Sequence, residues 1–460
     1  MFQIISHSDQ NDKALFSSIE RFFSDFDLSK LLLKCNFYKA SGFSCVLILK
    51  QLFSLIFSGK NLYRALDLNS NDLSFRKNTA YRFLNEGRFN WEKLLMLMMT
   101  RLVCFIDQLT GKDRQSVLII DDSLFSRDRS KKVELLARVF DHTSHTFHKG
   151  FRMLTLGWSD GNTFLPLCFQ LLSSTEDKNV YCPAQQKDKR TLASKRRENA
   201  RRSTTDVLLD MLHSVQHIPA RYVLFDSWFT FPKTVARIKS MQRDVIGMIK
   251  KTEKVHYLYE NKWQDVKAIY QKIKKSADPK AQVLGSACVR LRENKSATAE
   301  EWVDARLVFV KDRHSKDWLA LLCTDLELSD EEIVRLYGKR WDIEVFFKVC
   351  KSHLALAKEF QGRSYDMQVA ATTIVFLRYA MLAIEARKNQ DDRTLGDLFY
   401  LLKEEMADIK LSYSLMILID TLRHVLHNLP TISEDLANTI LNAFFDALPS
   451  SIKDRLLSCA

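Results

Sequence analysis

Five side chains that suit phosphate chemistry recur at helical spacing within one segment of this 460-residue chain. A tyrosine, three cations and one glutamate form the set: Tyr337, Arg340, Glu344, Lys348 and Lys351. At about 100° per residue, an α-helix would place the other four within about 40° of Glu344. A carboxylate binds hard metal ions, whereas guanidinium, ammonium and phenol groups bind phosphate oxygens. The stripe therefore predicts a site where a metal ion and a phosphodiester meet.

The same spacing has a simpler interpretation as an exposed ladder of ion pairs. Arg340 and Glu344 are four residues apart, and so are Glu344 and Lys348. Such pairs stabilise a solvated helix by about 0.2–0.5 kcal/mol each. The helix alone does not distinguish between the two interpretations. Residues elsewhere in the chain have to decide between them.

Aspartates that follow two apolar runs favour the catalytic interpretation. Val117–Ile120 predicts a buried strand ending at Asp121 and Asp122, and Tyr222–Phe225 predicts another ending at Asp226. Polar groups at the carboxyl ends of strands line the ligand crevice of open α/β sheets. One such aspartate is more often a turn residue, but converging carboxylates need a neutralising cation. A pair of Mg²⁺ ions would neutralise them and hold substrate phosphates.

The surrounding pattern predicts a mixed α/β protein. Apolar runs predict further strands over 150–158, 163–172, 281–292, 302–310 and 318–323, with a turn over 159–162 and a helix over 205–213. Ser329 is a predicted N-cap, and Glu332 completes a capping box at the start of the helix that carries Glu344.

Changes in this pattern predict five regions along the chain. They are a helical N-terminal DNA-binding region over 1–113, the first part of the core over 114–250, a β-rich insertion over 251–327, the second part of the core over 328–385, and a helical C-terminal region over 386–460.

Composition indicates a globular protein with a polyanionic partner. Hydrophobic residues make up 46% of the chain, which argues against disorder, and 69 Lys+Arg against 56 Asp+Glu give a net charge of +13. The nine cysteines form no C-x-x-C pair, so a reducing cytoplasm is expected. Charged residues interrupt the apolar runs near 45–57 and 369–384, which predicts buried helices and no membrane span.

The chain resembles the insertion-sequence four family of bacterial DDE transposases. The spacing from Tyr337 through Arg340 and Glu344 to Lys351 looks like that family's signature. The segments 119–123 and 225–229 resemble its two aspartate blocks, and 360–365 is similar to the segment that follows its glutamate helix. The resemblance covers residues 115–385.

That resemblance implies a ribonuclease H-like catalytic core interrupted by the β-rich insertion. Asp122, Asp226 and Glu344 would be the catalytic residues and the ligands of Mg²⁺, with Mn²⁺ as a substitute. Asp122 is preferred because the family pattern places the acid directly before a hydroxyl residue, here Ser123. Asp121 is the alternative, since adjacent side chains of a strand face opposite ways.

Phosphate contacts are expected from two sets of residues. The first is the helical set of Tyr337, Arg340, Lys348 and Lys351. The second lies in the basic run 187–202, where half the residues are Lys or Arg. This run is either a solvated loop or a surface that follows the DNA backbone. The contacts expected there are Lys195, Arg196, Arg197, Arg201 and Arg202.

By resemblance the protein would be a cut-and-paste transposase of the bacterial cytoplasm, associated with the nucleoid. It would cleave DNA at terminal inverted repeats and join the freed 3′-OH to double-stranded target DNA, as a homodimer in a synaptic complex. The alternatives are a ribonuclease H-like nuclease or resolvase without strand transfer, and a catalytically inactive DNA-binding descendant. A basic RNA-binding protein with a coincidental stripe is a further alternative.

Overall fold

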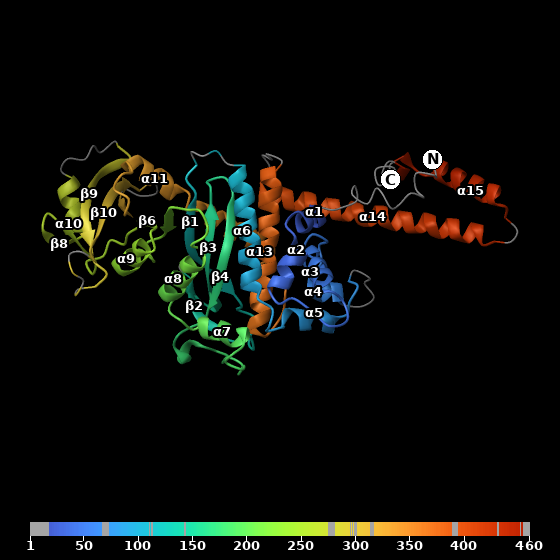
Figure 1. Ribbon diagram of the computed structural model, residues 1–460, viewed down its shortest axis with the longest axis horizontal. Helices are drawn as coiled ribbons and strands as arrows, with labels where there is room; N and C mark the ends of the chain where they lie inside the picture. Colours follow the sequence, from blue (N-terminus) through green and yellow to red (C-terminus); the bar gives the residue numbers. More distant parts are fainter. Residues whose placement is uncertain are drawn as a thin grey trace.

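The computed structural model describes residues 18–66, 73–109, 111, 114–141, 144–274, 281–294, 296, 298, 301–312, 317–388, 394–429, 432–450 and 452–453. They form a mixed α/β protein built on an eleven-stranded sheet (Figure 1). The strands are β1 (Val117–Ser126), β2 (Ala137–Asp141), β3 (Thr146–Ser159), β4 (Phe164–Leu172), β5 (Tyr222–Phe225), β6 (Asp244–Met248), β7 (His256–Tyr259), β8 (Lys262–Asp265), β9 (Val283–Leu291), β10 (Val303–Lys311) and β11 (Trp318–Cys323).

Helices precede, interrupt and follow these strands. They are α1 (Ser18–Asp25), α2 (Leu28–Lys34), α3 (Cys45–Ser54), α4 (Leu62–Leu66), α5 (Lys77–Leu84), α6 (Trp91–Gln108), α7 (Leu192–Asn199), α8 (Thr204–Ser214), α9 (Pro232–Ser240), α10 (Val266–Ile273), α11 (Asp330–Gly338), α12 (Trp341–Ser352), α13 (Tyr365–Lys388), α14 (Leu395–His427) and α15 (Glu434–Ala447), with a short 3₁₀ turn at Asp177–Asn179.

The central strands combine antiparallel pairs on one side of β1 with parallel pairs on the other. β1 pairs antiparallel with β3, which pairs antiparallel with β4. On its other side β1 pairs parallel with β5, and β5 pairs parallel with β6. The parallel pairing of β1 with β5 ends at Ile120 and Phe225, so the next residues along these strands, Asp121 and Asp226, follow at the same edge.

Strand β1 is longer than its apolar run predicts. It continues to Ser126 because β3 remains paired with it down to Gly150. Asp121 and Asp122 therefore lie inside β1 and follow only the part that is paired with β5, which corrects the expectation that the strand ends before them. The predicted strands over 222–225 and 318–323 coincide with β5 and β11.

Helices α6 and α13 cover β4 and join the sheet to the N-terminal helices (Figure 1). Every residue of α13 from Tyr365 to Ile384 is buried, so this helix is a core element, although its length and composition would also suit a membrane span. One continuous hydrophobic core runs from Ile19 in α1 through the sheet to Leu402 in α14. The helices before the sheet are therefore packed onto the same core as the strands.

Strands β7 to β11 lie between β6 and α11 in the chain and extend the same sheet, because β11 pairs antiparallel with β6. At the opposite end of the molecule α14 projects away from the core, and α15 folds back beside it (Figure 1). The 33 residues of α14 span about 50 Å at 1.5 Å per residue.

Candidate active site

Two aspartates meet where the parallel part of the sheet ends. Asp121 and Asp226 follow paired residues of adjacent strands, whose backbones lie about 4.8 Å apart. The amide of Trp228 donates a 2.8 Å hydrogen bond to Asp226 Oδ1 and so orients this carboxylate. The pKa of Asp121 is raised to about 7, chiefly by burial and also by the negative charges of Asp226 and Asp122, against the opposing effect of Arg340.

The adjacent aspartates of β1 have different partners. The Asp121 carboxylate lies 3.2 Å from Nη1 of Arg340, at the start of α12. The Asp122 carboxylate instead lies 3.2 Å from Nε of Arg152, on strand β3. An ion pair therefore joins Asp121 to the helix that carries Glu344.

The helix expected over 337–351 is divided into two. α11 ends at Gly338 and α12 begins at Trp341. Between them the backbone hydrogen bonds join residues that are three apart in the chain, as where Arg340 N donates to Tyr337 O at 3.0 Å. Glycine is a weak helix former, and a tight turn of this kind divides helices. The expectation of one continuous helix is corrected in this respect. The predicted capping box of Ser329 and Glu332 is confirmed at the start of α11.

Arg340 connects the acid edge of the sheet with α12. Its guanidinium pairs with Asp121 through Nη1 and with Glu344 through Nη2. It also lies 5.9 Å from the centre of the Tyr337 ring. Burial is the main cause that raises the pKa of Tyr337 above its usual range, and the charges of Asp226 and Asp121 raise it further. Asp121, Glu344 and Tyr337 thus gather around one guanidinium.

A groove of about 1650 Å³ runs from these acids along β1. It is lined by β1 and the loop up to Val133, by Asp226 and the turn after it, and by residues between α12 and α13. Lys351 lines it as well, with its Nζ 2.5 Å from Ser123 Oγ. Glu344 is not among the lining residues and is joined to the acids through Arg340. Lys348 is exposed on the following turn of α12.

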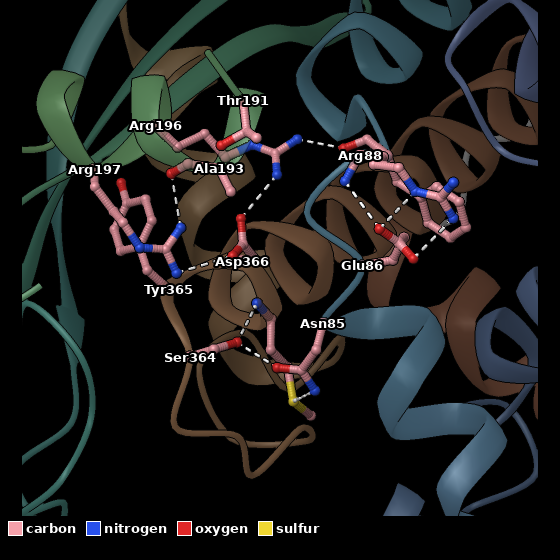
Figure 2. Close-up of polar contacts among 12 residues, drawn as sticks. Asn85, Glu86, Arg88, Thr191, Ala193, Arg196, Arg197, Ser364, Tyr365 and Asp366 are labelled. Carbon is pink, nitrogen blue, oxygen red and sulfur yellow. Dashed lines mark hydrogen bonds and ion pairs between the residues drawn. The ribbon is translucent and has the colours of Figure 1, made fainter. Parts of the chain in front are cut away.

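Two of the expected phosphate contacts on α7 are buried. Arg196 and Arg197 are each 4% exposed, and their guanidinium groups converge on Asp366 of α13, at 2.9 Å each (Figure 2). Arg196 also pairs with Glu92 of α6 at 2.9 Å, and Arg197 with Glu134 at 2.6 Å. Guanidinium groups enclosed by carboxylates cannot reach DNA. The expectation of DNA contacts at Arg196 and Arg197 is corrected, because they join α7 to the core.

The remaining basic residues of this segment differ in their surroundings. Arg201 pairs with Asp177 at 2.7 Å and Arg202 with Asp210 at 2.5 Å, so nearby carboxylates already neutralise both. Lys195 is exposed on α7. The segment is thus neither a simple solvated loop nor a row of unpaired cations.

Several groove residues were not identified from the sequence. Arg152 pairs with Asp122, Lys250 lies 3.9 Å above the Trp228 ring, and Arg129, Lys131 and Lys132 line the loop after β1. An arginine inside an otherwise apolar strand was a usable signal for Arg152. The loop residues carried no comparable signal, because clusters of basic residues are common on protein surfaces.

The donor chemistry of the edge suits a hard divalent cation. Asp121 and Asp226 offer carboxylate oxygens at the ends of paired segments of adjacent strands, and the negative charges of Asp226 and Asp122 contribute to the raised pKa of Asp121. Within the residues that the structure describes, no three His, Cys, Asp or Glu side chains lie close enough to hold a metal ion together. Glu344 would have to leave Arg340 to complete such a set.

Residues 62–305 match the family described as DDE superfamily endonuclease. The matched stretch contains Asp121, Asp122 and Asp226 and ends before Glu344. No curated protein matches the chain.

Proposed function

Since this chain belongs to the DDE superfamily endonucleases, which act on DNA and generally use divalent metals, we propose that it is a DNA transposase. It would cleave DNA at insertion-sequence ends and join the 3′-OH to a target, as the resemblance to the insertion-sequence four family implies. The observation that carries the proposal is the adjacency of Asp121 and Asp226, with Arg340 linking Asp121 to Glu344.

The order of the central strands supports a ribonuclease H-like core. β4, β3, β1, β5 and β6 follow one another in the sheet, with β3 antiparallel to β1, and β5 and β6 parallel to it. Strands β7 to β11 would then be the insertion between β6 and the glutamate helix.

We assign the first catalytic position to Asp121 in place of Asp122. Asp121 is the member of the pair that interacts with Asp226 and, through Arg340, with Glu344. Asp122 is neutralised by Arg152 and lines the groove beside it. Alternating directions along a strand make it unfavourable for both carboxylates to serve the same ion.

Asp121, Asp226 and Glu344 would hold the divalent metal, with Mg²⁺ preferred and Mn²⁺ as a substitute. Such ions activate the attacking oxygen and stabilise the leaving oxygen in phosphoryl transfer. Arg340 would become available to a phosphate oxygen once another cation neutralised the two acids with which it pairs. Lys351 and Lys348 would add charge-assisted contacts to phosphates of the same DNA strand.

The proposal extends to partners and location. Two element ends have to be brought together, so a homodimer in a synaptic complex on terminal inverted repeats is expected. The place of action would be the cytoplasm, at the nucleoid, where the element and its target both reside.

The test is a plasmid assay with the flanking inverted repeats, in Mg²⁺ and in EDTA. Wild-type protein should excise and reinsert the element in Mg²⁺ only, Glu344→Gln should do neither, and Glu331→Gln should behave as wild type. Glu331 is a matched control because it is an exposed glutamate in the first turn of α11. Cleavage without joining would replace the transposase with a nuclease, and metal-independent cleavage would overturn the proposal.

A further inference from the structure

The end of the groove that lies away from the acids is lined by exposed cations from two segments. They are Arg129, Lys131 and Lys132 in the loop after β1, and Lys358 and Arg363 between α12 and α13, which we call the basic wall. Within the described part of the chain, none of the five side chains forms an ion pair. The arginines at 196 and 197 in α7 and at 201 and 202 after it, by contrast, each have a carboxylate partner. Asp128 lies in the same loop but contacts His148, so the positive charge of the five side chains predominates, which favours a polyanionic ligand.

The wall is held rigidly by contacts behind it. Arg127 donates to the carbonyl of Phe360 at 3.0 Å and to Gln368 at 3.1 Å, which ties the two segments together. The Glu134 amide donates to the carbonyl of Arg363 at 2.8 Å, and its carboxylate pairs with Arg197. The buried Arg197–Asp366 pair in Figure 2 therefore supports the wall from the inside. A preorganised surface loses little entropy when it binds.

The side chains of the basic wall suit contacts with the phosphate backbone of DNA and not with unstacked bases. The groove residues at 126–133 and 356–363 include no aromatic side chain, so no stacking platform is present among them. Single-stranded DNA is typically bound by aromatic platforms as well as cations. Trp228, the exposed aromatic residue of the groove, lies beside Asp226 at the acid end.

We propose that the basic wall binds the phosphates of double-stranded DNA about five base pairs from the scissile phosphate. This inference rests on the proposed function, because it takes the acid end as the site of cleavage. β1 runs five residues from Asp121 to Ser126, which spans about 17 Å at 3.4 Å per residue. Base pairs of a duplex are also 3.4 Å apart, so a duplex that lies along β1 would have about five base pairs between the cleaved position and Ser126, where the loop that carries Arg129 begins.

The test measures the salt dependence of binding to a short duplex in EDTA, where no cleavage occurs. Lys131→Gln/Lys132→Gln should make the slope of log K against log salt less steep by about 1.8, since each lost phosphate contact removes about 0.9. The control is Lys254→Gln/Lys262→Gln, which removes two exposed lysines at the β7–β8 end of the sheet and should leave the slope unchanged. A duplex that extends only three base pairs from the cleaved position toward the wall should abolish the difference in slope between the two variants.

Two results would overturn the proposal. The first is that the salt slope for duplex binding is the same in Lys131→Gln/Lys132→Gln and in the control variant. The second is that the decrease in slope appears with single-stranded DNA and not with the duplex. Either result leaves the proposed function intact if wild-type protein still cleaves in Mg²⁺. Failure of cleavage with a normal slope difference would instead remove the transposase assignment and leave a duplex-binding groove.

Discussion

Arg340 holds Asp121 with Nη1 at 3.2 Å, although 219 residues of chain separate them. The same guanidinium pairs with Glu344. One protein cation thus neutralises two of the three proposed metal ligands. The acids, which repel one another, are thereby compatible with a folded protein in the absence of metal.

The assignment of Asp121 leads to a paired mutational prediction. Asp121→Asn should abolish cleavage while duplex binding is retained, because the lost carboxylate is a metal ligand. Asp122→Asn should reduce cleavage by about 10- to 100-fold, as for residues that support ligands without binding the ion. The measurement is a cleavage rate in Mg²⁺ alongside a binding isotherm. The reverse order of severity would restore Asp122 as the catalytic residue.

Removal of Arg340 should affect binding as well as chemistry. Arg340→Ala is expected to weaken duplex binding and cleavage together, because the guanidinium is proposed to move to a phosphate. It should also raise the pKa of Asp121 above about 7, since Arg340 is the group that lowers it. Carboxyl ¹³C chemical shifts would report that pKa in the metal-free protein. An unchanged pKa would mean that the ion pair between Arg340 and Asp121 does not affect the ionisation of Asp121 in solution.

The stability of the metal-free protein should depend on Asp121 between pH 4 and 7. Its pKa is raised from 3.8 to about 7 on folding, so the unfolded chain ionises first as the pH rises. The stabilising contribution is complete below pH 3.8 and is lost as the pH rises through about 7. The free energy of unfolding of Asp121→Asn, relative to wild type, should therefore increase across this range. Urea titrations in EDTA would detect it, and a pH-independent difference would contradict it.

The buried network of α7 should contribute to stability and not directly to DNA affinity. Arg197→Met leaves the buried Glu134 without its guanidinium partner and Asp366 with Arg196 alone, which should cost about 3–5 kcal/mol in the free energy of unfolding. The matched control is Arg201→Met, whose partner Asp177 is 91% exposed, and its cost should be below about 1 kcal/mol. Equal costs in denaturant unfolding would argue against the burial of Arg197.

Local patterns in the sequence were sufficient for most of the secondary structure. Short apolar runs such as 222–225 predict strands because consecutive buried residues are needed where a strand is covered on both faces. The capping box of Ser329 and Glu332 predicts the start of α11 because its hydrogen bonds are made within one turn. These interactions are short-range, so the residues that make them are neighbours in the sequence.

What the tertiary structure decided depends on partners that are distant in the chain. The different partners of Asp121 and Asp122, on which our proposed choice between them rests, follow from which face of β1 meets Arg340 and which meets Arg152. The burial of Arg196 and Arg197 follows from carboxylates on α6, α13 and the loop before β2. A run of basic residues looks the same whether its charges face DNA or buried acids. The sequence by itself determined which residue types were available, and only folding determined which opposite charges would meet, because ion pairing depends on distance in space.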